Sequence, residues 1–258
     1  MSAWFLDIPG ITGSETLSTQ RLAAWPDRAM DDRLHHLRVC PVVPSELYQI
    51  ARHLPVTVVD QADGPMVMVD LRTEVLRQPA FDSDGRFQRS YRPAVTRLLP
   101  FCTSAQGALL RLSDEMAPPG PERPAELQQQ VAQMLRAQAA GLGRLAEAAG
   151  LLINEGLLRR SAEGDLVEWR PLPAEQDGAA TAANLAPRPE SFLALRLLAV
   201  MEFSAMHRRE DRGRRPNPDS LRGLLSRNEA LRRRVFLTRD EMLDFSALTA
   251  GPPHNHKA

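Results

Sequence analysis

The stretch VTVVDQADGPMVMVD, residues 56–70, decides the fold class of this chain. Residues 56–60 and 66–70 are mostly apolar and include several β-branched side chains, which are enriched in strands. Between them, QADGP (61–65) combines an Asp-Gly pair with a proline, which is typical of a tight turn. The stretch therefore predicts two antiparallel strands.

Residues near this pair predict a short helix, a second turn and a further strand. A helix is indicated over residues 45–53, because Ser45 is a good N-cap and apolar residues share one face. FDSDGRF (81–87) places an Asp-Gly turn between two phenylalanines. Residues 108–112 resemble another strand, so the N-terminal half predicts a small, mainly antiparallel sheet with short helices.

The stretch YRPAVTRLLPF (91–101) predicts one short helix between two prolines. Pro93 fits the first turn, where its missing N–H costs nothing, and Pro100 ends the helix. The apolar residues can face the core. Tyr91 and Arg97 are the two residues that packing alone does not explain.

The C-terminal half has a different character. APPGPERP (117–124) is too rich in proline for a helix and predicts a linker. Residues 125–149 carry apolar residues every three or four positions and predict a long amphipathic helix. A second element is expected from residue 151, a strand at 165–169, and a strongly apolar helix at 192–209.

Together these patterns predict an α+β fold, in which the sheet with its short helices packs against C-terminal helices. We expect one compact unit with the apolar helix from Phe192 over the sheet. The predicted divisions are an irregular leader (1–30), an α+β domain (31–235) and a tail (236–258). Within the domain, 31–115 is sheet-rich, 117–124 is the linker and 125–235 is helical.

Composition limits the class of protein. The chain has 258 residues, 43% of them apolar, which is enough for a substantial core. Lys plus Arg equals Asp plus Glu at 32 each, so no overall basic excess attracts nucleic acid, and no nucleic-acid partner is expected. Cys40 and Cys102 lack a CxxC spacing, which disfavours a disulfide framework and a thiolate zinc site.

The pattern of apolar residues indicates a cytoplasmic protein. The N-terminus has no basic region followed by an apolar run, as a signal peptide would have. No window approaches 18 uninterrupted apolar residues, so no transmembrane segment is expected. The oligomeric state is not indicated.

Several segments, in this order, resemble the SapC family, bacterial proteins of about this length named after a surface-layer gene locus. The family has an acidic residue before a Tyr-Pro-Ile-Val-Phe-like strand, an Asp-Gly turn, and a Tyr-x-Pro-Ala helix that ends in Pro-Phe. The similar segments here are LHHLR (34–38), Ser45 and Glu46 leading to HLPVTV (53–58), FDSDGRF running into YRPAVTRLLPF, and FLALR (192–196) reaching MEF (201–203) and His207.

The resemblance touches most of residues 34–209, thinly between 113 and 190. Leu54 stands where an aromatic residue is common, and residues 208–210 replace the usual small polar continuation after the histidine. The chain is therefore similar to a divergent member. The resemblance implies a role in surface-layer biogenesis or transport, and it brings no catalytic mechanism.

Motifs for metals and cofactors are weak. His35 and His36 follow two aspartates, but adjacent residues point apart on a helix or strand, so a shared metal ion is disfavoured. His254 and His256 have an HxH spacing in the tail, where adventitious metal affinity is the usual meaning. Neither GxxxxGK[ST] nor GxGxxG occurs. Cys102 is expected to be a buried structural thiol, and neither a metal nor a cofactor is predicted.

Three functions remain open. The first is a non-catalytic accessory or binding protein of the SapC type, which acts on a protein or peptide partner. The second is an enzyme of unknown reaction whose pocket lies around Tyr91, Arg97 and His207, with the further candidates Glu46 and His53. The third is an anionic-surface binder that uses its C-terminal arginines, Arg208, Arg209, Arg212, Arg214 and Arg215.

Overall fold

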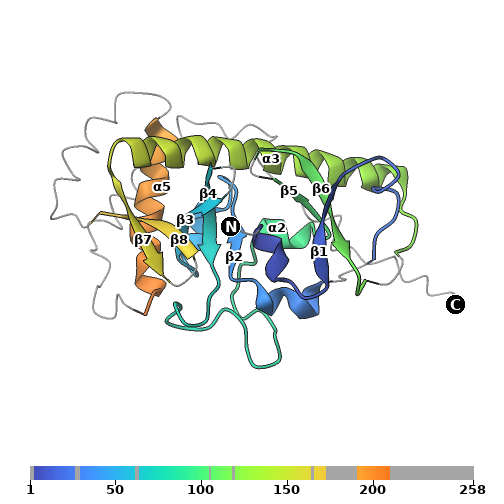
Figure 1. The fold of residues 1–258 in the computed structure, drawn as a ribbon, viewed down its shortest axis with the longest axis horizontal. Coiled ribbons are helices and arrows are strands. Elements are labelled where there is room, and N and C mark those ends of the chain that lie inside the picture. The colour runs from blue at the N-terminus through green and yellow to red at the C-terminus, as the bar shows by residue number, and fades with distance from the viewer. Residues whose placement is uncertain are drawn as a thin grey trace, which may run out of the picture.

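The computed structural model describes residues 3–26, 30–61, 64–104, 106–117, 120–163, 166–172 and 191–209. Two antiparallel sheets pack with helices, which confirms the predicted α+β class (Figure 1). The strands are β1 (Ile11–Thr16), β2 (Val39–Pro41), β3 (Val56–Gln61), β4 (Gly64–Asp70), β5 (Phe101–Thr103), β6 (Leu109–Asp114), β7 (Leu158–Glu163) and β8 (Leu166–Pro171). The helices are η1 (Trp4–Asp7), η2 (Asp31–His36), α1 (Leu47–Ala51), α2 (Ala94–Arg97), α3 (Ala125–Asn154), α5 (Ser191–Ser204) and η3 (Ala205–His207).

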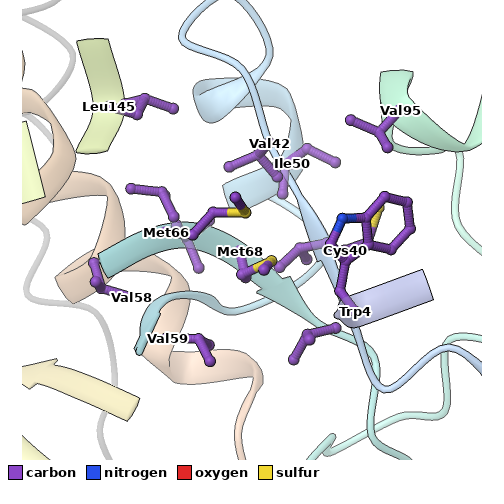
Figure 2. Close-up of a cluster of buried hydrophobic side chains, with 14 of the residues drawn as sticks. Trp4, Cys40, Val42, Ile50, Val58, Val59, Met66, Met68, Val95 and Leu145 are labelled. Atoms are coloured by element: carbon purple, nitrogen blue, oxygen red, sulfur yellow. The ribbon is translucent and has the colours of Figure 1, made fainter. Parts of the chain in front are cut away.

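The five-stranded sheet is built on the predicted hairpin. β3 and β4 pair antiparallel from Val56↔Val69 to Gln61↔Gly64, which confirms the prediction for residues 56–70. The strand order is β2-β4-β3-β8-β7. The buried side chains of Val58, Met66 and Met68 lie in the main core, a cluster drawn in part in Figure 2.

The C-terminal half contributes two strands to this sheet. β8 includes residues 166–169 of the predicted strand 165–169 and pairs with β3, and β7 pairs with β8. The division of 125–235 as helical is therefore wrong over β7, which no pattern predicted, and it does not hold over β8, where the strand itself was predicted. β7 was not predicted because its sequence, LRRSAE, contains few apolar residues. Edge strands often carry charged side chains of this kind.

The predicted leader is also more regular than expected. β1 pairs with β6 in the three-stranded sheet, whose order is β1-β6-β5. Trp4 is buried in the main core, where Figure 2 labels it, instead of lying across the surface. The sequence pattern did not predict β1, because most of its residues are polar and exposed. A bulge also interrupts its register with β6 between Ile11 and Gly13.

The long helix α3 joins the two sheets. It runs to Asn154, so residue 151 does not begin a new element as predicted, and at 30 residues it is about 45 Å long. Figure 1 shows α3 extending along both sheets. Its C-terminal half packs into the main core, and its N-terminal half packs into a second cluster, the Trp25 cluster. The Trp25 cluster comprises Leu22, Trp25, Ala94, Leu98, Phe101, Val131, Met134 and Leu135.

The predicted short elements are present. α1 lies within 45–53, although Glu46 rather than Ser45 precedes its first residue. α2 follows Pro93 directly and is a single turn. Phe81 and Phe87 form an antiparallel bridge around the Asp-Gly turn, and their rings meet edge to face at 5.3 Å between centroids.

The described part of the proline-rich segment is held against Trp25. Arg123 donates its backbone N–H to Ala23 and a guanidinium N–H to the Trp25 carbonyl, with N···O distances of 2.8 Å in both cases. Residues 120–124 are thus anchored rather than free. Residues 210–235 of the predicted domain and the predicted tail 236–258 lie outside the described residues.

Two glycines of α3 provide a matched test of this packing. A Cβ on Gly141 would lie 2.9 Å from the Pro44 Cδ atom, whereas a Cβ on Gly143 would meet nothing within 4 Å. We expect Gly143→Ala to raise the free energy of unfolding by up to about 1 kcal/mol, because alanine is the better helix former. Gly141→Ala should lower it by about 1 kcal/mol or more, because the contact with Pro44 overpacks the site. Urea unfolding of both variants measures these changes, and equal stabilisation would contradict the close approach of α3 to Pro44.

Candidate functional site

Glu46 is a buried carboxylate at the start of α1. It is 2% exposed, and its Oε1 atom accepts the backbone N–H of Val43 at 3.0 Å. Its Oε2 atom accepts the backbone N–H of Ala94 at 2.8 Å and the hydroxyl of Tyr91 at 3.3 Å. The carboxylate thus connects the turn before α1 with the segment that enters α2.

Tyr91 and Arg97 complete this cluster. Burial raises the pKa of Glu46 to about 7, although its hydrogen bonds with Ala94, Val43 and Tyr91 and the charge of Arg97 lower it. Burial and the negative charge of Glu46 raise the pKa of Tyr91 to about 12. The Arg97 guanidinium lies 5.3 Å from the centroid of the Tyr91 ring. The structure therefore brings together three of the five catalytic candidates.

The two histidine candidates lie at the other end of α1. His53 Nε2 is 3.0 Å from the Ser90 Oγ atom, and His207 donates its Nε2–H to the Ala51 carbonyl at 3.1 Å. His53 is seven positions after Glu46, which corresponds to about 10 Å along a helix. The five candidates thus form two groups rather than one pocket.

Both histidines have lowered pKa values. Burial is the largest cause for each. The charges of Arg52 and Arg89 lower the pKa of His53 further. For His207, the hydrogen bond with Ala51 raises the pKa, while Arg89 and His53 lower it.

The arginine candidates differ in how accessible they are. Arg208 is 4% exposed and is not available to an anionic surface, contrary to the prediction. Arg209 is exposed, and its Nε–H donates to the Leu76 carbonyl at 2.7 Å. Arg212, Arg214 and Arg215 lie outside the described residues.

Arg208 belongs to a buried ionic cluster that sequence reasoning missed. Its Nη2 atom lies 3.0 Å from Glu168 Oε2 and 3.3 Å from Asp70 Oδ2. Arg72 binds Asp70 through Nε at 3.0 Å and Nη2 at 2.7 Å. Arg170 donates its Nε–H to Glu168 Oε1 at 2.9 Å. The cluster therefore connects the end of β4, the middle of β8 and the residue after η3.

The arginines control the ionisation of Glu168. Burial raises its pKa, but Arg208, Arg170 and Arg72 together lower it to about 2. The Thr57 hydroxyl on β3 also donates to Glu168 Oε2 at 3.0 Å. The only sequence signal for this cluster was the presence of charged residues in otherwise apolar strands, and that signal does not identify the partners.

The structure also places the metal and thiol candidates. His35 and His36 stack with ring centroids 4.0 Å apart, rather than pointing apart as expected. No group of three or more potential ligands (His, Cys, Asp or Glu) that could hold a metal ion is found among the described residues. Cys40 and Cys102 are fully buried, and burial raises the pKa of both thiols, to about 12 for Cys102. Cys102 is the buried thiol that was predicted.

Comparisons with known proteins give no match to any family model, curated protein or solved structure. The resemblance to the SapC family thus stays a prediction from the order of its motifs. In the part of the chain that the structure describes, no helix is both long and apolar enough to cross a bilayer.

Glu46 should make stability depend on pH with an unusual sign. Its pKa is about 7 in the folded protein and 4.5 in the unfolded chain, so the folded state binds more protons between these values. Stability should therefore fall as pH rises from 4.5 to 7, by on the order of 3 kcal/mol. Glu46→Gln should remove this component, and unfolding free energies measured at half-unit pH steps test it. Glu147→Gln, on the exposed face of α3, is the control and should follow the wild type. A Glu46→Gln profile parallel to the wild type would contradict the prediction.

Glu168→Gln should destabilise the protein by about 3–5 kcal/mol at pH 7, because it leaves buried arginines without their carboxylate. The lowered pKa means that this stabilisation is present above pH 4.5 and is lost as pH falls toward 2. The difference between wild type and variant should narrow over that range in urea unfolding. Thr57→Val, which removes one hydroxyl donor from the ionised Glu168 carboxylate, should cost about 1.5–3 kcal/mol, less than Glu168→Gln, and serves as the comparison. A Glu168→Gln variant as stable as Thr57→Val would contradict this assignment.

Proposed function

We propose that the protein is a non-catalytic accessory or binding protein that takes up an extended segment of a polypeptide partner beside β7. The single observation that carries this proposal is the outer edge of β7, which no other strand in the described part of the chain covers. β7 is the last strand of the five-stranded sheet, and all six of its residues are in register with β8. No other described strand pairs with it. An extended peptide can extend such an edge through main-chain hydrogen bonds.

The other sheet edges are less suitable. β2 and β5 are three residues long and wholly buried. β1 carries the bulge that interrupts its register, and bulges protect edges against pairing. β7 is therefore the regular and accessible edge among the described strands.

Charge favours an acidic partner segment. Arg159 and Arg160 on β7 are both exposed. Arg160 lies 3.5 Å from Asp60, whereas no ion pair joins Arg159 to a described residue. Arg159 is directly opposite Arg170 on β8, and like charges in that position are unfavourable. A carboxylate from an added strand beside Arg159 would relieve this repulsion.

The contacts of the other candidates give less support to the alternatives. Glu46 holds two backbone N–H groups and the Tyr91 hydroxyl, and His207 lies at the opposite end of α1. The proposed enzyme pocket around Tyr91, Arg97 and His207 therefore lacks a shared centre. The anionic-surface alternative loses Arg208, which is buried among carboxylates.

Charge reversal at Arg159 tests the proposal. A polypeptide that the immobilised protein retains from a cell extract should bind Arg159→Glu at least about tenfold more weakly, a loss of about 1.4 kcal/mol, because a carboxylate would then face a carboxylate. Biolayer interferometry with the purified partner measures the dissociation constants.

The matched control is Arg136→Glu, which reverses the charge of an exposed arginine in the N-terminal half of α3, outside β7. It should leave the affinity unchanged. Equal binding by wild type and Arg159→Glu, or no retained polypeptide, would overturn the proposal. A dimer that dissociates on Arg159→Glu would instead identify a second copy of the chain as the occupant of the edge.

A further inference from the structure

We infer that Arg89, His53, His207 and Ser90 form a binding site for an oxyanion, a carboxylate or phosphate group, at the C-terminal end of α1. All four side chains carry hydrogen-bond donors, and three of them can carry positive charge. None of them belongs to β7, so the inference does not depend on the proposed function.

Three segments bring these residues together. The backbone N–H of Arg77 donates to the His207 carbonyl at 2.8 Å, which fixes η3 against the loop after β4. The Arg89 guanidinium donates to the next residues of that loop, to Gln78 Oε1 and to the Pro79 carbonyl, both at 3.0 Å. Ser90, which follows Arg89, reaches His53. Arg89 is therefore bound to the loop that contacts η3, and it directly precedes the residue that contacts His53.

The charge of Arg89 is not balanced by a described carboxylate. Its hydrogen-bond acceptors are the neutral oxygens of Gln78 and Pro79. Its Nε atom is buried and has no hydrogen-bond partner among the described residues. A buried donor without an acceptor is costly, and a guanidinium binds oxyanions through two such donors. This orphaned Nε is the observation that points to a missing anionic acceptor.

The surroundings are rich in cations. Arg89 lowers the pKa of His53 and of His207, which requires that its charge be felt at both imidazoles. The basic residues on the elements that meet here include Arg52, Arg77, Arg86 and Arg209, and the acidic residues include Glu74, Asp82, Asp84 and Glu202. Arg72 and Arg208 also belong to these segments, but they are paired with Asp70 and Glu168. A bound oxyanion would oppose the effect of Arg89 and raise both histidine pKa values, so binding should strengthen as pH falls through the range in which the two imidazoles gain a proton.

The experiment is an NMR titration of the two histidine side chains in the full-length protein. Inorganic sulfate and acetate are the two probes, because sulfate represents a phosphate group and keeps a fixed charge, whereas acetate represents a carboxylate. We expect saturable shifts of both imidazoles and a rise in their pKa values. A response to sulfate alone assigns the site to phosphate groups, and a response to acetate alone assigns it to carboxylates.

Arg89→Gln should weaken binding at least about tenfold, in keeping with a charged hydrogen bond. Arg86→Gln, at an exposed arginine of the same loop, is the matched control and should bind like the wild type. His53→Asn is a second variant that keeps a polar side chain beside Ser90, and it should weaken binding at pH 6 more than at pH 8. No saturable shift with either probe, or equal effects of the Arg89 and Arg86 substitutions, would overturn the inference.

Discussion

The buried carboxylate of Glu168 constrains the whole five-stranded sheet. Glu168 and Asp70 are completely buried, and removing such charges from water costs several kcal/mol unless cations meet them. The cations come from β8, from the residues after β4 and from the residue after η3. Because no one segment supplies the full set, β8 and the C-terminal helix must both be in place before the charges are balanced. This constraint explains why β8 lies beside β3 although the two strands are far apart in the sequence.

A second constraint joins the two apolar clusters. α3 contributes to both the main core and the Trp25 cluster. Glu46 accepts backbone N–H groups from Val43, before α1, and from Ala94, which belongs to the Trp25 cluster. The three donors of Glu46 are groups that would otherwise be buried without an acceptor, so its carboxylate is retained in spite of a raised pKa. Glu46, a catalytic candidate from the sequence, therefore uses both of its carboxylate oxygens to hold other parts of the fold.

The two features that suggest function lie outside these two clusters of buried charged residues. The β7 edge has main-chain groups and an arginine without a described ionic partner, and the end of α1 has a group of donors without a described carboxylate. Both are positively charged positions in a chain whose formal net charge is zero. Local charge, rather than overall composition, therefore determines which partners the molecule suits.

The sequence by itself determined the elements whose pattern is local. The hairpin at 56–70, the turn at 81–87, the helix between Pro93 and Pro100 and the amphipathic α3 all follow from side-chain period and turn chemistry, which act over a few residues. The α+β class followed from their order. Tyr91 and Arg97 could also be named from the sequence, because packing alone did not explain them, and Glu46 was a further catalytic candidate.

Only the tertiary structure decided which distant residues meet. It paired β8 with β3, placed β1 beside β6, buried Arg208 against Glu168, and placed His207 at the end of α1 opposite Glu46. Each of these outcomes depends on pairing between segments whose own patterns are polar or short, and such patterns carry no information about their partners. The sequence named the charged residues, and the three-dimensional arrangement determined whether each one is buried in an ion pair or left at a surface.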